Sequence, residues 1–157
     1  MKRNEVRITD LWNKEKSKSL SEFIIDQSNK QTKERKLRNE LLSIQFKIED
    51  YIESENVIQK LNILDFVKMY LSALNITQKR LADLFEMKDS NLYKYLVGER
   101  KLNTTIVLKL SSFTDLNPEY WLRIEVKNEL IEINKEKIKI KFFRKYNYQN
   151  LLTVQED

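Results

Sequence analysis

Residues 77–101 read TQKRLADLFEMKDSNLYKYLVGERK, the most informative pattern in the chain. Thr77 belongs to the residue types that cap helix N-termini, because its side-chain oxygen accepts a hydrogen bond from a free backbone N–H. The helix that it starts buries Leu81, Ala82 and Phe85, which recur at helical spacing. The small Ala82 lies where a second helix would cross closely.

A second helix follows within the same stretch. Met87 anchors the turn between the two helices, and Leu92, Tyr95 and Leu96 form the buried side of the second one. This helix ends at Gly98, where a positive φ has no steric cost. The pattern therefore predicts two short helices joined by a tight turn.

The outer face of the second helix is polar. The side chains that point away from the core are those of Lys88, Ser90, Asn91 and Lys94. A helix with such groups can enter the major groove of DNA, where donors and acceptors meet base edges. The alternative is a solvated charged face that binds nothing.

The flanking sequence completes a set of five short helices. The preceding helix has one apolar face between Ile63 and Leu74, and another helix starts near residue 103. The fifth begins at Asn117, which can cap, with Pro118 at the first helical position. Trp121 in this helix is an interface anchor or a core residue, and its spacing favours the core. The predicted fold class is all-α.

Composition excludes most enzyme chemistry. The 157 residues include no Cys, no His and one Gly, so thiolate nucleophiles, imidazole acid–base groups, Cys/His zinc sites and glycine-rich phosphate loops cannot form. We expect no enzyme, no metal and no cofactor. The net charge of +5 is compatible with nucleic acid. No stretch has the roughly 18 apolar residues of a membrane span, so we expect a cytoplasmic protein.

The N-terminal part is highly polar. Residues 1–18 carry few apolar groups, so we expect this arm to be mobile alone or ordered by a partner. From residue 19 to 53 the pattern is helical, with a break expected near residues 27–30. An apolar stripe runs from Leu37 to Tyr51. The stripe packs on the domain's own core or pairs with another chain.

The tail has a different period. In Lys137-Ile138-Lys139-Ile140-Lys141-Phe142 the apolar residues alternate, which favours a half-buried strand over a continued helix. A lone strand is unstable in water and would need a partner. The basic run from Lys135 to Lys145 contacts DNA phosphates or a partner, or forms a solvated strand edge.

The central residues resemble the Cro/C1-type (XRE) helix-turn-helix family, and most of all the HigA-type antitoxins. The resemblance covers about residues 61–133. It rests on Gln78 with Leu81-Ala82, on the run from Leu92 to Lys101, on Leu110 with Phe113, and on Leu116-Asn117-Pro118-Glu119-Tyr120-Trp121-Leu122. It implies a five-helix lambda-repressor-like domain at 57–133. A mobile arm and amphipathic helix would precede it at 1–56, and a tail with a possible short β-strand would follow at 134–157.

Two residues depart from the family pattern. Glu86 stands at the turn and Asp115 before the last helix, where the family has Gly. A non-Gly residue with positive φ costs on the order of 1 kcal/mol, which a packed domain tolerates. The departures could also mark a motif that has lost DNA binding.

The resemblance implies specific roles on double-stranded DNA. Gln78 contacts phosphate at a helix N-terminus, while Ser90, Asn91 and Lys94 form the base-reading face with Lys88 beside it. Asp89 is ambiguous between a helix cap and a base reader. The residues after the second helix that would hold phosphates are Arg100, Lys101 and Asn103.

Three functions fit these features. The first is a repressor that binds its own operator as a homodimer and neutralises a RelE-like ribonuclease toxin in a HigBA-like pair. The second is a stand-alone, phage-type regulator. The third is a protein-interaction module that keeps the fold without DNA binding, and in that case alanine at Asn91 and Lys94 would change nothing.

Overall fold

The computed structural model describes residues 6–56 and 59–153, with side chains from residue 14 onward. Every regular element in these ranges is helical, which confirms the all-α prediction. The chain divides into two compact units, residues 1–42 and 43–157. None of the helices in the described ranges is both long and apolar enough to cross a lipid bilayer.

One long helix, α1 (Val6–Glu53), occupies most of the first unit and enters the second. One prediction was wrong here, because the helix continues without a break at residues 27–30. Residues 6–18 are helical, and their expected mobility stays a prediction. Residues 1–5 lie outside the described ranges. The physical reason is that residues 6–53 contain neither Gly nor Pro, so each added residue extends the hydrogen-bonded ladder at little cost.

The last turns of α1 belong to the core of the second unit. Ile44, Ile48 and Tyr51 are buried, whereas Leu37 and Leu41 are partly exposed. The apolar stripe thus packs on the domain's own core at its C-terminal end, as one of the two interpretations expected. Closer to the N-terminus, in the first unit, four apolar side chains are exposed, namely Leu20, Phe23, Ile24 and Ile25.

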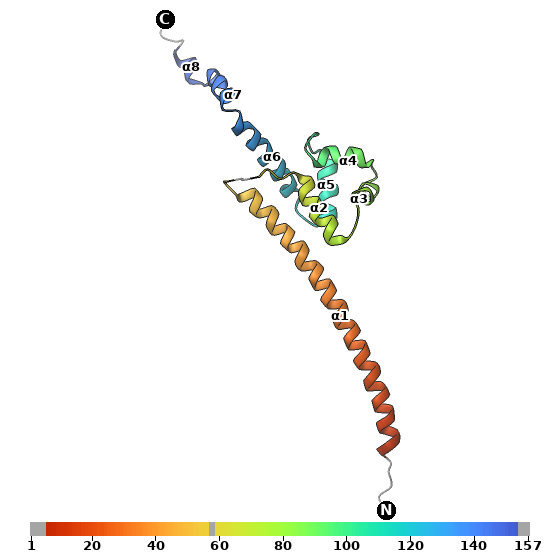
Figure 1. Ribbon diagram of the computed structural model, residues 1–157. Helices are drawn as coiled ribbons and strands as arrows, with labels where there is room; N and C mark the ends of the chain where they lie inside the picture. The colour runs from red at the N-terminus through yellow and green to blue at the C-terminus, as the bar shows by residue number, and fades with distance from the viewer. Residues whose placement is uncertain (1–5, 57–58, 154–157) are drawn as a thin grey trace, which may run out of the picture. The chain divides into compact units, whose positions relative to one another are not determined.

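Five helices form the predicted bundle within the second unit (Figure 1). They are α2 (Ile63–Leu74), α3 (Gln78–Leu84), α4 (Asp89–Leu96), α5 (Thr104–Thr114) and α6 (Pro118–Lys135). The predicted caps are confirmed, because the side chains of Thr77 and Asn117 accept hydrogen bonds from the backbone N–H groups of Arg80 and Glu119. Pro118 is at the first helical position.

The core is centred on aromatic rings. Trp121 is fully buried, as the sequence favoured, and its ring centroid lies 6.5 Å from that of Tyr70. Tyr70 also meets Phe113, at 6.4 Å, and Phe113 meets Phe85 at 6.1 Å. Burial raises the pKa of Tyr70 to about 12, because the ionised phenol would lose its hydration.

A polar network joins segments that are distant in the sequence. The Tyr51 hydroxyl donates to the Asn128 side-chain oxygen and accepts from the Leu61 backbone N–H, and the Asn128 amide donates to the Leu61 carbonyl. Burial raises the pKa of Tyr51. The network fixes the chain before α2 between α1 and α6, and no local sequence pattern predicts it.

The tail is helical, and the predicted strand is wrong. It consists of α7 (Lys137–Phe142), the 3-10 helix η1 (Phe143–Tyr146) and α8 (Gln149–Leu152). A helix satisfies its backbone hydrogen bonds internally, whereas a strand needs a neighbour, and no strand exists in the described ranges. None of these tail elements buries a side chain, and Ile138 is 87% exposed.

Candidate nucleic-acid interface

The turn between α3 and α4 is held by backbone geometry. Glu86 adopts φ 55°, in the left-handed region, and the Met87 N–H donates to the Ala82 carbonyl at 3.0 Å. Ala82 is 1% exposed, and its small side chain permits the close approach of the two helices that the sequence predicted. The Lys109 ammonium donates to the Phe85 carbonyl and ties the turn to α5.

The outer face of α4 is built on two buried leucines. Leu92 and Leu96 are almost completely inaccessible, which fixes the rotation of α4 about its axis. Of the predicted site residues, Lys88 lies immediately before the helix, Ser90 and Asn91 are in its first turn, and Lys94 is in its last turn. Lys88 and Ser90 are exposed, and Asn91 and Lys94 are half-buried.

The N-termini of α3 and α4 are joined by one hydrogen bond. The Gln78 amide nitrogen donates to an oxygen of Asp89 at 2.7 Å. Gln78 is the first residue of α3 and Asp89 the first of α4, where a carboxylate is favoured by the helix dipole. The hydrogen bond therefore places Gln78 beside the N-terminal end of α4, near Lys88, Ser90 and Asn91. It also gives Asp89 a contact within the domain that holds its side chain in position.

The three predicted residues after α4 form a separate group. The Arg100 guanidinium lies 5.9 Å from the centre of the Tyr95 ring. The Asn103 oxygen accepts from the Ile106 N–H at 2.9 Å and its amide donates to the Tyr95 hydroxyl at 3.3 Å. Asn103 is thus a cap for α5, with both ends of its amide engaged within the domain.

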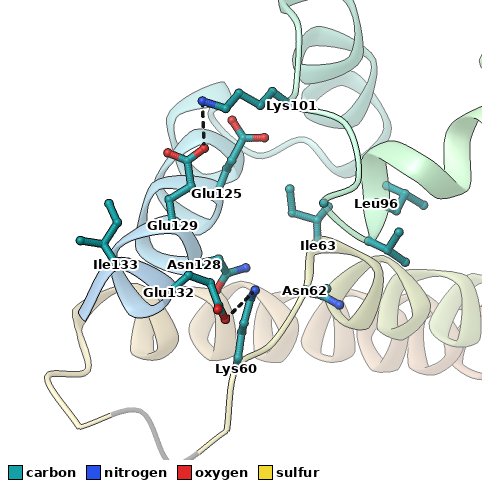
Figure 2. A pocket seen from close by; sticks show the side chains of 12 residues that line it. Lys60, Asn62, Ile63, Leu96, Lys101, Glu125, Asn128, Glu129, Glu132 and Ile133 are labelled. Carbon is teal, nitrogen blue, oxygen red and sulfur yellow. Dashed lines mark hydrogen bonds and ion pairs between the residues drawn. The ribbon is translucent and has the colours of Figure 1, made fainter. Parts of the chain in front are cut away.

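Lys101 faces α6. Its ammonium lies 3.3 Å from Glu129, at the rim of a cavity of about 380 Å³ where Lys60 pairs with Glu132 at 3.2 Å (Figure 2). The hydrogen bond from Lys60 lowers the pKa of Glu132. The Lys101 side chain is still 81% exposed, so this surface ion pair contributes little stability and leaves the ammonium accessible.

One positioning residue escaped the sequence analysis. The Glu125 carboxylate on α6 accepts the Leu102 N–H at 2.7 Å and so fixes the loop that carries Arg100 and Lys101. The two partners are separated by 23 residues and no spacing rule links them.

Acidic groups limit where phosphate can lie. A hollow beside the α3–α4 turn is lined by Asp83, Glu86 and Asp89 together with Lys79, Lys88, Met87 and Asn91. These carboxylates oppose a phosphate over the turn itself.

The residues with positive φ lead to a stability prediction for two substitutions with opposite effects. Glu86 and Asp115, both at φ 55°, confirm the expected strain positions, and Gly98 is at φ +84°. Glu86→Gly is expected to raise the free energy of unfolding by about 0.5–1 kcal/mol because it relieves that strain, and Gly98→Ala to lower it by about 1 kcal/mol. Urea unfolding measures both, and equal signs would contradict the assignment.

The comparisons with known proteins agree with this geometry. The family model described as Helix-turn-helix matches residues 67–121, from within α2 to the first turn of α6. Residues 67–121 are therefore similar to the helix-turn-helix family, while α1 and the tail lie outside the match. No curated protein and no solved structure matches the chain.

Proposed function

We propose that the protein is a sequence-specific, DNA-binding transcriptional regulator that inserts α4 into the major groove. The observation that carries this proposal is the match of residues 67–121 to the helix-turn-helix family. In this domain Leu92 and Leu96 bury the inner side of α4, and its outer face is polar. Asn91 would hold adenine and Lys94 would reach guanine, the pairings that base-edge geometry favours. Ser90 would lie beside Lys94 on the same face of α4.

The remaining predicted residues would set the register on the duplex. Gln78, Arg100 and Lys101 would contact phosphates, and Lys88 would lie beside the base-reading face. Asn103 would position the loop through its contacts with α5 and Tyr95, with its backbone near the phosphates. Two copies would read a pseudo-palindromic site with half-sites about one helical turn apart.

The test is DNA binding by fluorescence anisotropy. The probe is the segment immediately upstream of the protein's own gene, and a shuffled duplex of equal length is the reference. Asn91→Ala/Lys94→Ala is expected to weaken binding to the upstream segment at least tenfold and to leave the reference unchanged, because base contacts are worth about 1–3 kcal/mol each. A salt series separates the contribution of phosphate contacts to the binding free energy from that of base contacts, because phosphate contacts weaken as salt rises.

A matched variant controls for charge. Lys68→Ala removes one exposed lysine from α2, the same net change of charge as the double variant, and is expected to bind as the wild type does. Weak binding of both DNAs that is unchanged by the α4 substitutions would contradict the proposal. It would favour the interaction module, in which the helix-turn-helix serves as scaffold.

We further propose that the regulator is a cytoplasmic repressor and the antitoxin of a HigBA-like pair. Support comes from the Leu116–Leu122 motif and from the exposed apolar side chains of α1 and of the tail, which offer surfaces to a protein partner. A RelE-like ribonuclease toxin would be encoded by a short basic reading frame beside this one. A gene without such a neighbour would favour the stand-alone regulator.

A further inference from the structure

One aromatic side chain on the surface of α4 was not among the site residues predicted from the sequence. Tyr93 lies in the middle of α4, directly after the buried Leu92, and is 45% exposed. Asn91 and Lys94, which the sequence selected as base readers, are only half-buried to exposed on the same helix, and each is less accessible than Tyr93. The most accessible large group on α4 is therefore an aromatic ring.

Contacts within the domain do not explain why a tyrosine stands at position 93. Its side chain makes no hydrogen bond, ion pair or aromatic contact with any other residue of the described ranges. Tyr95 differs in this respect, because its hydroxyl accepts from the Asn103 amide at 3.3 Å and its ring lies 5.9 Å from the Arg100 guanidinium. A half-exposed ring without such partners contributes little to folding, so Tyr93 is available to a ligand.

The rotation of α4 keeps this ring on the surface. Leu92 and Leu96 are buried and fix the helix about its axis. Ser90 precedes Tyr93 by three residues and Val97 follows it by four, so the three side chains are neighbours on one side of the helix. Ser90 is exposed and Val97 is half-buried. This side of α4 therefore presents an apolar surface next to a hydroxyl group.

We propose that Tyr93 is a specificity-determining residue whose ring contacts the C5-methyl group of a thymine in the major groove. The inference rests on the proposed function, in which α4 enters that groove, and it adds a base that Asn91 and Lys94 are not expected to read. Thymine is the only base that presents a methyl group in the major groove, and apolar side chains recognise it by direct contact. The contact excludes water from both surfaces.

The ring, rather than the hydroxyl, is the part of Tyr93 that the rest of the site lacks. A hydroxyl could donate to a phosphate, but Arg100 and Lys101 already offer charged donors in the loop after α4. Hydrogen bonds from charged donors to phosphate are roughly twice as strong as those from neutral ones. Polar side chains for adenine and guanine are also present on α4, whereas no other aromatic side chain on this helix is as free of contacts within the domain.

The test removes the methyl groups from the DNA. The probe is the duplex from immediately upstream of the protein's own gene, prepared once with thymidine and once with deoxyuridine at every thymidine position. Uracil lacks only the C5-methyl group and pairs with adenine in the same way. The wild-type full chain is expected to bind the uracil duplex about fourfold more weakly for one methyl contact, and more weakly still when both half-sites are read. Fluorescence anisotropy measures both affinities.

Three variants assign the methyl contact to a chemical group. Tyr93→Ala is expected to bind the thymine duplex at least about fourfold more weakly than the wild type and to bind both duplexes equally. Tyr93→Phe keeps the ring and is expected to keep the wild-type preference for thymine. Tyr148→Ala is the matched control, because Tyr148 is a 68% exposed tyrosine in the tail and its loss should leave the preference unchanged. Circular dichroism confirms that each variant is folded.

The outcomes separate this inference from the proposed function. A preference for thymine that survives Tyr93→Ala would place the methyl contact on another residue and overturn the assignment. A phenylalanine variant that behaves as the alanine variant does would assign the contact to the hydroxyl and also overturn it. Equal binding of both duplexes by the wild type overturns the role of Tyr93 alone, provided that Asn91→Ala/Lys94→Ala still abolishes selective binding. A wild type that does not select the upstream segment overturns both proposals.

Discussion

Trp121→Ala is expected to lower the free energy of unfolding of the 43–157 unit by about 3–5 kcal/mol. Trp121 is the largest of the fully buried side chains, and α6 is anchored through it beside Tyr70. Alanine would remove most of these contacts and leave a cavity that a close-packed core cannot fill completely. Such a loss is a large part of the stability of a small domain, so partial unfolding at room temperature is the expected phenotype.

Trp121→Phe provides the informative comparison. The Trp121 Nε1–H is buried and has no hydrogen-bond partner among the described residues. An unpaired buried donor costs about 1–3 kcal/mol, and phenylalanine removes that cost while it loses part of the ring volume. The phenylalanine variant is therefore expected to lose less than about 2 kcal/mol.

Urea unfolding followed by circular dichroism measures both variants, since the substitution removes the buried tryptophan and leaves only Trp12. The midpoints should fall in the order wild type, phenylalanine, alanine, with similar slopes. An alanine variant within 1 kcal/mol of the wild type would mean that Trp121 does not hold α6 on the bundle.

Local chemistry explains why the bundle was predictable from the sequence. Thr77 and Asn117 cap helices within three residues of themselves, and Gly98 ends α4 through its own backbone angle. Glu86 and Asp115 take positive φ for the same local reason, because a turn at those positions imposes it. Signals that act over three or four residues can be read without knowing the fold.

The strand error and the missed contacts arose where the outcome depends on distant partners or on their absence. Lys137–Phe142 alternates as a strand does, but a strand needs a neighbour that the described chain does not provide, so the segment is helical. The contacts of Tyr51 with Asn128 and of Leu102 with Glu125 join residues far apart in the sequence. No pattern within one helix contains that information.

In the candidate site, too, some residues follow from local spacing and others depend on distant contacts. Lys88, Ser90, Asn91 and Lys94 follow from the helical spacing of Leu92 and Leu96, and the structure places them on or beside the outer face of α4. The residues after α4 do not follow from spacing. Asn103 and Lys101 are placed by Tyr95, Ile106 and Glu129, which belong to other parts of the fold.

Ile48→Ala is expected to lower the free energy of unfolding of the same unit by about 2–5 kcal/mol, although residue 48 lies outside the segment that matches the helix-turn-helix family. Ile48 is fully buried, and neighbouring turns of α1 contribute Ile44 and Tyr51 to the same core. The last turns of α1 would thus be a structural part of the DNA-binding domain rather than a separable arm.

Phe46→Ala is the matched control, because Phe46 lies two residues away on the same helix and is 53% exposed. Its loss is expected to change stability by no more than about 0.5 kcal/mol. In a Trp12→Phe background Trp121 is the only tryptophan, so its fluorescence in urea reports the unfolding of the 43–157 unit alone. If the two alanine variants unfold at the same urea concentration, residues 43–53 do not belong to the core. If only Ile48→Ala is weakened, any truncation meant to isolate the DNA-binding domain has to begin before residue 43.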